Sequence, residues 1–169
     1  MSKKTVVGLI CISLAAVKLS MAGTDSDTES KKLVGIWQAS DVMPAAWAKA
    51  YQFFSDGKFV FNASQENHTS RERNFSGTWA LTDGKLILLV KQKTVMEGGK
   101  IIDDNDPILG RHLEGAKQNV IPINPPEKKV LRMGRITIGK NGYDGSDMLT
   151  VKIGDSQYWK FDDDPRRYP

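Results

Sequence analysis

Apolar and polar positions alternate over several short stretches of the chain. Residues 58–63 are the clearest case, since Phe59, Phe61 and Ala63 fall on one face and Lys58 falls on the other. A period of two is typical of a β-strand with one buried face. Similar stretches, rich in aromatic and β-branched residues, occur at residues 33–39, 51–54, 77–81, 85–90, 130–138, 148–153 and 157–161. The pattern predicts about eight strands.

Turns that contain glycine separate these stretches. Asp56-Gly57 lies between residues 51–54 and the stretch at 58–63, and Asp83-Gly84 lies between the next two predicted strands. The Asp-Gly pair is typical of tight hairpin turns, which need residues with positive φ. We therefore expect a meander of antiparallel strands. At most one short helix is expected, at residues 41–49.

A meander of about eight antiparallel strands has to avoid long unpaired edges. Closing the sheet into an up-and-down barrel meets this need with sequential hairpins alone. A barrel of eight strands is just wide enough to be filled by side chains or to hold one small ligand. The same strand count allows a two-sheet sandwich. The predicted fold class is all-β, an up-and-down barrel with the sandwich as the alternative.

Residues 97–129 break the strand rhythm. Glycine and proline recur throughout this stretch, which leaves little room for a long regular element. A loop of such length inside one domain is uncommon and often functional. We expect a loop insert here, which would cap the mouth of a barrel or split it.

The N-terminus has the three parts of a secretory signal peptide. Lys3 and Lys4 form a basic start, Thr5–Val17 form an apolar stretch, and Ser20-Met21-Ala22 form a small-x-small cleavage site. The apolar stretch is shorter than the ~20 residues that cross a bilayer as a helix. We therefore expect residues 1–22 to be removed on export, which leaves no membrane span in the mature chain.

Removal of the signal peptide changes the charge and the cysteine content. The loss of Lys3, Lys4 and Lys18 lowers the 24 basic residues to 21, against 20 acidic residues, so the net charge falls to about +1. Cys11 is the one cysteine and would leave as well, so no thiol remains for a disulfide, a nucleophile or a metal site. An exported domain without cysteine fits a bacterial periplasm or bacterial secretion. The near-neutral charge gives no support for nucleic-acid binding.

The mature chain has the length of one domain. Residues 23–32 contain no apolar side chain to bury, so we expect a disordered leader there. A single β domain then spans residues 33–162, and residues 163–169 form a tail.

Three motifs in the first half of the chain resemble those of small bacterial lipocalin-like domains. They are Gly35-Ile36-Trp37, Phe54-Ser55-Asp56-Gly57-Lys58-Phe59 and Gly77-Thr78-Trp79-Ala80-Leu81, and the resemblance covers residues 33–90. In that family the first tryptophan looks into the closed end of the barrel, beneath a basic residue from a late strand. The resemblance therefore implies structural roles for Gly35 and Trp37, with Arg135 or Lys160 as the covering residue.

Residue types that serve catalysis or metal binding do not form matching patterns. His68 and His112 lie far apart in predicted loops, so no short spacing places them on one face of an element. The acidic run Asp103–Asp106 is followed by Pro107, and it lacks the glycine that a calcium-binding loop needs at its sixth position. A Gly-x-Ser-x-Gly motif does not occur. We expect no enzyme activity, no bound metal and no cofactor.

Aromatic residues on the predicted strands are the candidates for a ligand site. They are Phe53, Phe59, Phe61, Trp79 and Trp159. These positions would face one interior, where they either form an ordinary core or line a pocket. The first hypothesis is therefore an exported lipocalin-like protein that binds a small apolar or amphipathic ligand.

The second hypothesis is a periplasmic protein-binding module with a filled core. A hydrolase inhibitor, an immunity protein or an envelope accessory protein would belong to this class. Residue types that are frequent at protein interfaces gather near the C-terminus, namely Trp159, Phe161, Arg166, Arg167 and Tyr168.

Overall fold

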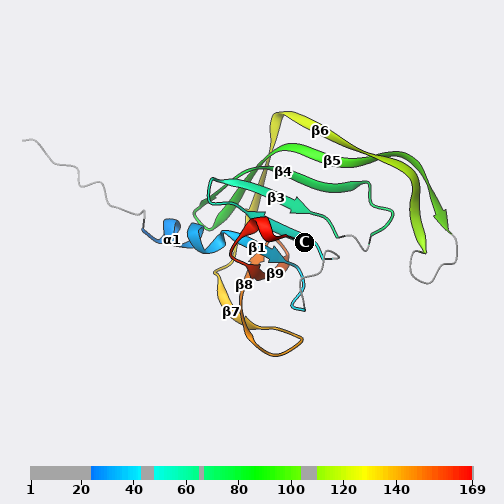
Figure 1. The fold of residues 1–169 in the computed structure, drawn as a ribbon. Coiled ribbons are helices and arrows are strands. Elements are labelled where there is room, and N and C mark those ends of the chain that lie inside the picture. Colours follow the sequence, from blue (N-terminus) through cyan, green and yellow to red (C-terminus); the bar gives the residue numbers. More distant parts are fainter. Residues whose placement is uncertain (1–23, 43–47, 65–66, 104–109, 169) are drawn as a thin grey trace, which may run out of the picture.

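The computed structural model of the protein describes residues 24–42, 48–64, 67–103 and 110–168 (Figure 1). The predicted signal peptide at residues 1–22 lies outside these ranges, and so does most of the helical turn expected at residues 41–49. Within the described ranges, no helix is long and apolar enough to cross a bilayer.

The described chain is mostly β. Its elements are α1 (Thr24–Leu33), β1 (Gly35–Gln38), β2 (Ala50–Phe53), β3 (Lys58–Asn62), β4 (Glu72–Thr82), β5 (Lys85–Asp103), β6 (Arg111–Arg132), β7 (Thr137–Lys140), β8 (Asp147–Ile153), β9 (Ser156–Asp162) and the 3-10 helix η1 (Pro165–Arg167). These strands form one antiparallel sheet in the order β6-β5-β4-β3-β2-β1-β9-β8-β7. The predicted all-β class is confirmed. The described residues form nine strands rather than about eight, because the stretch at residues 130–138 is divided between β6 and β7.

Both Asp-Gly pairs form the hairpin turns that the sequence predicts. Gly57 has a φ of 79°, and its N–H donates to the Phe54 carbonyl oxygen at 3.1 Å between β2 and β3. Asp83 and Gly84 both have positive φ, at 50° and 67°, between β4 and β5. Positive φ at the turn matches the right-handed twist of two paired strands. These local turns therefore set the register of the two strand pairs.

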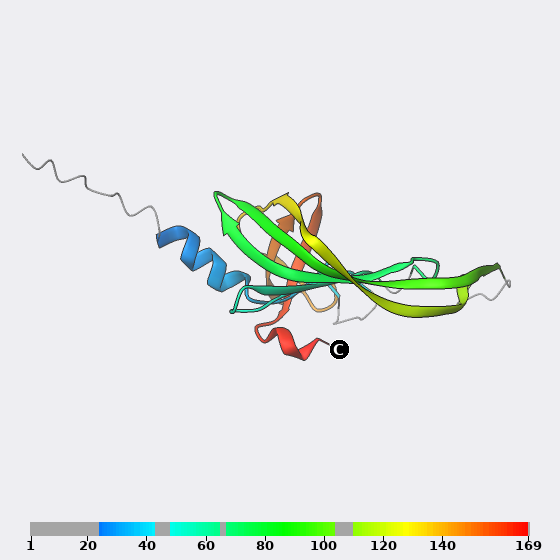
Figure 2. The same cartoon turned by 90° about the horizontal axis from the view of Figure 1, so that it is seen from above.

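The sheet curls strongly but is not closed (Figures 1 and 2). Strands β6 and β7 are its two edges. The chain just after β6 meets β8 at one isolated bridge, between Met133 and Ile153. Beside this bridge the Gly134 N–H donates to the Lys152 carbonyl oxygen at 2.8 Å. The sheet is therefore open along most of the seam where a barrel would close.

The prediction of a loop insert at residues 97–129 is wrong. These residues belong largely to the long hairpin of β5 and β6, which projects from the body of the sheet as an arm (Figure 2). Gly98 and Gly99 remain within β5 at φ values of 68° and 66°. Residues 123–126, which include two prolines, bulge opposite Lys91. Strand β6 is an edge strand, so one of its sides has no neighbouring strand. A proline whose missing N–H would point to that side removes no hydrogen bond between strands, and the strand can therefore continue.

The prediction of a disordered leader is also corrected, because residues 24–33 form helix α1. The helix is polar except for Leu33, which is fully buried. Two hydrogen bonds hold its C-terminal end: Trp37 Nε1 donates to the Leu33 carbonyl oxygen at 2.7 Å, and Lys160 Nζ donates to the Lys32 carbonyl oxygen at 3.0 Å. The last carbonyl groups of a helix lack partners within the helix. Contacts with the β domain therefore stabilise a segment whose own composition does not.

The core lies on the inner side of the curled sheet. Its buried members are Leu33, Trp37, Tyr51, Phe53, Phe59, Phe75, Leu86, Leu88, Val90, Met133, Val151, Ile153 and Tyr158. Strand alternation explains which residues of β5 belong to the core: Leu86 and Leu88 are buried, whereas Leu89 is exposed. The sheet therefore has a filled inner side and an outer face that the core does not cover.

Candidate functional site

The aromatic residues predicted to line a ligand pocket mostly lie in the core. Phe53 and Phe59 are buried, and Phe61 and Trp79 pack against the buried cluster. Trp159 is half-buried and follows the buried Tyr158 on β9, so strand alternation places it on the opposite face. Four of the five residues are thus brought together, and Trp159 is not.

Neighbouring aromatic residues, above all Tyr51, are in contact with the rings of these predicted ligand residues. The ring centroid of Tyr51 lies 5.2 Å from that of Phe53, 4.7 Å from that of Phe61 and 5.3 Å from that of Tyr158. Phe61 also stacks on Phe75 at 4.6 Å. Ring pairs at such distances contribute about 0.5–1.5 kcal/mol each beyond their buried area. Ring-on-ring packing therefore fills the interior at these positions.

Gly35 and Trp37 both lie at closely packed positions of β1. Gly35 has a φ of 129°, and a Cβ atom there would collide with the Asp162 carbonyl oxygen. Trp37 is fully buried. The residue over its ring is Lys160, whose Nζ lies 5.8 Å from the ring centroid. Arg135 is exposed and is therefore the wrong choice, because the register of β1 and β9 places Lys160 directly opposite Trp37.

Metal-binding residue types do not cluster in the part of the chain that the structure describes. There, no three histidine, cysteine, aspartate or glutamate side chains lie close enough to hold an ion. His112 Nδ1 is 3.3 Å from the Gly110 carbonyl oxygen. Asp103 lies near Arg111, with 3.8 Å between Oδ2 and Nε, and the rest of the acidic run lies outside the described residues.

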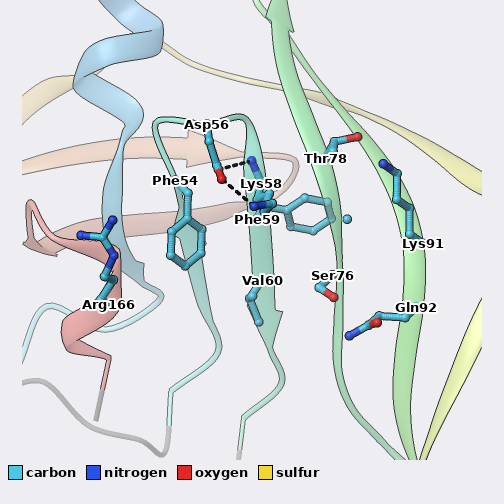
Figure 3. A pocket seen from close by; sticks show the side chains of 11 residues that line it. Phe54, Asp56, Lys58, Phe59, Val60, Ser76, Thr78, Lys91, Gln92 and Arg166 are labelled. Carbon is cyan, nitrogen blue, oxygen red and sulfur yellow. Dashed lines mark hydrogen bonds and ion pairs between the residues drawn. The ribbon is translucent and has the colours of Figure 1, made fainter.

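A hollow of about 590 Å³ opens on the outer face of β3, β4 and β5 (Figure 3). The register places Lys58 opposite Thr78 and Val60 opposite Ser76, and residues directly opposite one another share a face. The residues of these strands that border the hollow include Lys58, Val60, Ser76, Thr78, Lys91 and Gln92. Arg166 borders it from the C-terminal tail, and Phe59 is the one predicted ligand residue that borders it.

The residues around this hollow carry more positive than negative charge. Lys58 Nζ lies 2.7 Å from Asp56 Oδ2, and the Lys58 N–H donates to Asp56 Oδ1 at 3.1 Å. These hydrogen bonds lower the pKa of the Asp56 carboxyl group. Lys91 and Arg166 add two further positive charges. The hollow therefore suits an anionic group on whatever molecule enters it.

The C-terminal tail forms one wall of the hollow and is held firmly on the sheet. Gln52 Nε2 donates to the Pro165 carbonyl oxygen at 2.7 Å, and Asn62 Nδ2 donates to Gln52 Oε1 at 2.9 Å. Asp164 caps η1, since its Oδ1 accepts a hydrogen bond of 3.0 Å from the Arg166 N–H. The Arg166 side chain itself is 81% exposed. Its guanidinium Nη1 lies 3.8 Å from Asp164 Oδ1, so the tail presents an exposed cation that is paired with a neighbouring carboxylate.

Two further hollows follow the tail. One of about 390 Å³ lies at the turn between β2 and β3 and shares Phe54, Asp56 and Arg166 with the first. The other, of about 370 Å³, is bordered by Tyr168. Burial raises the pKa of Tyr168, and its buried Oη has no hydrogen-bond partner among the described residues. This third hollow shares no bordering residue with the other two, and what all three have in common is a residue of the tail at their border. We call the three hollows together the outer groove.

Sequence reasoning missed the outer groove because its residues come from separate segments. Only strand register and the docking of the tail bring Ser76, Lys91 and Arg166 to one hollow. One signal was available: Lys58 and Val60 alternate with the apolar residues of a predicted strand and so had to face outward.

Comparisons with known protein families, with curated proteins and with solved structures find no match to this chain. The resemblance to lipocalin-like domains therefore stays a prediction. The function has to be argued from the geometry of the site.

Proposed function

We propose that this protein is an exported protein-binding module whose outer groove takes an extended segment of a partner protein. One observation carries this proposal. Aromatic rings fill the interior at the predicted ligand positions, whereas open space lies on the outer face along the C-terminal tail. A binding function is therefore better supported at the groove than inside the sheet.

The chemistry of the first hollow suits a polypeptide segment with acidic side chains, whereas the second hollow is bordered by Asp56, Asp163 and Asp164. Ser76, Thr78 and Gln92 place hydrogen-bonding groups beside the first hollow, where an extended backbone needs partners. Lys91 and Arg166 add positive charge there. Complementary charge across an interface speeds encounter and disfavours wrong partners. The exposed Arg166 and the tyrosine of the third hollow, Tyr168, are of residue types that dominate binding energy at protein interfaces.

The proposed location follows from the predicted signal peptide. An export signal at residues 1–22 would deliver the mature chain to the periplasm or the outside of a bacterium. The partner would then be another exported or envelope protein. No enzyme activity and no cofactor is part of this proposal.

Site-specific photo-crosslinking in the periplasm tests the groove. A photoreactive amino acid at Thr78 would lie in the first hollow, and one at Asp155 would lie in the exposed turn between β8 and β9. We expect a discrete protein adduct from position 78 and none from position 155. The double variant Lys91→Glu/Arg166→Glu should reduce the adduct at position 78.

Equal adducts from both positions, or no adduct at position 78, would contradict the proposal. The small-ligand hypothesis has its own signature in native mass spectrometry. A reproducible small extra mass on the mature chain would favour that hypothesis, and a bare chain or a complex with a second protein would favour the groove.

A further inference from the structure

A second outer surface lies beside the outer groove, on β4, β5 and β6. The register places Ile87 opposite both Ala80 and Val130, and Leu89 opposite Thr78. Leu89 is 37% exposed and Val130 is 52% exposed, although their neighbours along each strand face the core. We call Ala80, Ile87, Leu89 and Val130 the outer apolar patch. Figure 1 shows these three strands side by side.

Positive charges lie at two places on the border of the outer apolar patch. Lys128 lies opposite Leu89, and Lys85 lies opposite Arg132 at the end of the same strand pair. All three cationic side chains are exposed, and none has an ion-pair partner among the described residues. We call Lys85, Lys128 and Arg132 the basic rim.

The described strand positions that face outward on this surface carry no carboxylate, and the exposed Asp83 lies close by along the chain, in the turn before Lys85. The described residues at outward positions of 74–82, 85–92 and 126–132 include no aspartate or glutamate. Glu127 faces inward, where its carboxylate lies 3.2 Å from Lys93 Nζ and 3.6 Å from Lys129 Nζ. On that side the carboxylates of Glu72 and Glu127 balance the charges of Lys93 and Lys129, whereas the described outward positions carry cations without a carboxylate beside them. Since the mature chain has a net charge of only about +1, this excess of cations is a local feature.

We propose that the outer apolar patch and the basic rim dock on a lipid bilayer with anionic headgroups. The aliphatic side chains would enter the interfacial region, and the long cationic side chains would reach the phosphate groups around them. Each lysine or arginine near an anionic bilayer strengthens binding about fivefold.

The residue types favour a bilayer over a protein partner at this surface. The centre of a protein interface is usually rich in aromatic residues and poor in lysine. The outer apolar patch has no aromatic residue, and two of the three basic rim residues are lysines. This inference does not depend on the outer groove, because the patch and the rim share no residue with it. If both proposals hold, the groove would be presented at a membrane surface.

Co-sedimentation with vesicles tests the inference on the mature chain. We expect binding to an equal mixture of phosphatidylethanolamine and phosphatidylglycerol, and none to phosphatidylcholine alone. Lys85→Gln/Lys128→Gln/Arg132→Gln should weaken binding by about 100-fold. The matched control is Lys100→Gln/Lys117→Gln/Lys152→Gln, which removes the same charge from exposed positions elsewhere and should change binding by less than about threefold.

A second variant tests the apolar part. Leu89→Ser/Val130→Ser should weaken binding about tenfold without changing the charge, and circular dichroism would show that the variant is folded. Three outcomes would overturn the inference. They are failure of the unmodified chain to bind the anionic vesicles, equal loss in the two triple variants, and self-association of the chain that the Leu89→Ser/Val130→Ser variant abolishes. The last result would assign the surface to a second copy of the chain.

Discussion

Gly35 shows how a single residue can be required by the approach of two strands. At this position β1 passes so close to β9 that a Cβ atom would collide with the Asp162 carbonyl oxygen and lie 2.8 Å from Lys160 Cε. The φ of 129° adds a second obstacle, since side chains with a Cβ rarely adopt it. Glycine is therefore needed for steric and conformational reasons together.

Replacement of Gly35 by alanine should destabilise the fold more than the same change at a glycine in open space. Gly35→Ala is expected to lower the free energy of unfolding by about 3 kcal/mol. Gly154→Ala is the control, since Gly154 has a φ of 60° but no atom within 4 Å of the added Cβ, and about 1 kcal/mol is expected there. Urea unfolding followed by tryptophan fluorescence measures both values, and equal losses would contradict the steric argument.

The position of Lys160 shows what the spacing of residues along the sequence cannot predict. A basic residue over Trp37 was expected, and two candidates, Arg135 and Lys160, had suitable places in the sequence. Only the pairing of β1 with β9 selects Lys160, because it sets which residue of β9 lies opposite Trp37. The residue type was predictable, and its position was not.

At the scale of elements, the strands were predictable wherever turn residues and alternation agreed. The hairpins at Asp56-Gly57 and Asp83-Gly84 depend only on the backbone conformation of the turn residues themselves. The arm of β5 and β6 was not predicted, because glycine and proline normally end strands. In this arm, glycines with positive φ stay within β5, and β6 has a free edge.

Helix α1 should contribute to stability through its last residue. Leu33→Ala is expected to lower the free energy of unfolding by about 3 kcal/mol, because Leu33 is fully buried. Leu89→Ala, at an exposed position, should lower the free energy of unfolding by less than about 1 kcal/mol.

Hydrogen exchange should be fast over residues 24–31 and slow in β4 and β5, since an isolated helix of this length is marginal in water. Strong protection across all of α1 would contradict this view.

At the scale of the whole molecule, the inner and outer faces of the sheet have different chemistry. The inner side holds the aromatic cluster and the ion pairs of Lys93 and Lys129 with Glu127. The outer side carries the outer groove, the outer apolar patch and the basic rim. This division places the candidate binding surfaces outside, away from the residues that stabilise the core.

Buried tyrosines should make the stability of the molecule fall at high pH. Burial raises the pKa of Tyr158 to about 12 and also raises the pKa of Tyr51. The unfolded chain releases these protons near pH 10, so stability is complete below that pH and decreases above it, while the folded phenols stay protonated. For Tyr158 alone the loss should reach about 1 kcal/mol by pH 11.

Urea unfolding between pH 8 and pH 11 measures this effect. Tyr158→Phe should remove part of the decrease, because phenylalanine has no proton to release. Tyr143→Phe is the matched control, since Tyr143 is 74% exposed and should leave the pH dependence unchanged. A decrease of the same size in Tyr158→Phe would show that other groups cause it.

The sequence by itself determined the all-β class, the two Asp-Gly hairpins and the aromatic positions that form the core. These features depend on a period of two and on turn residues, which act over a few neighbouring positions. Only the tertiary structure decided that residues 24–33 form helix α1, that β5 and β6 form the arm and that Lys160 lies over Trp37. The outer groove and the outer apolar patch with its basic rim likewise became visible only in the tertiary structure. Each of these depends on strand register or on contacts between distant segments, and a linear pattern of residues does not specify which distant segments meet.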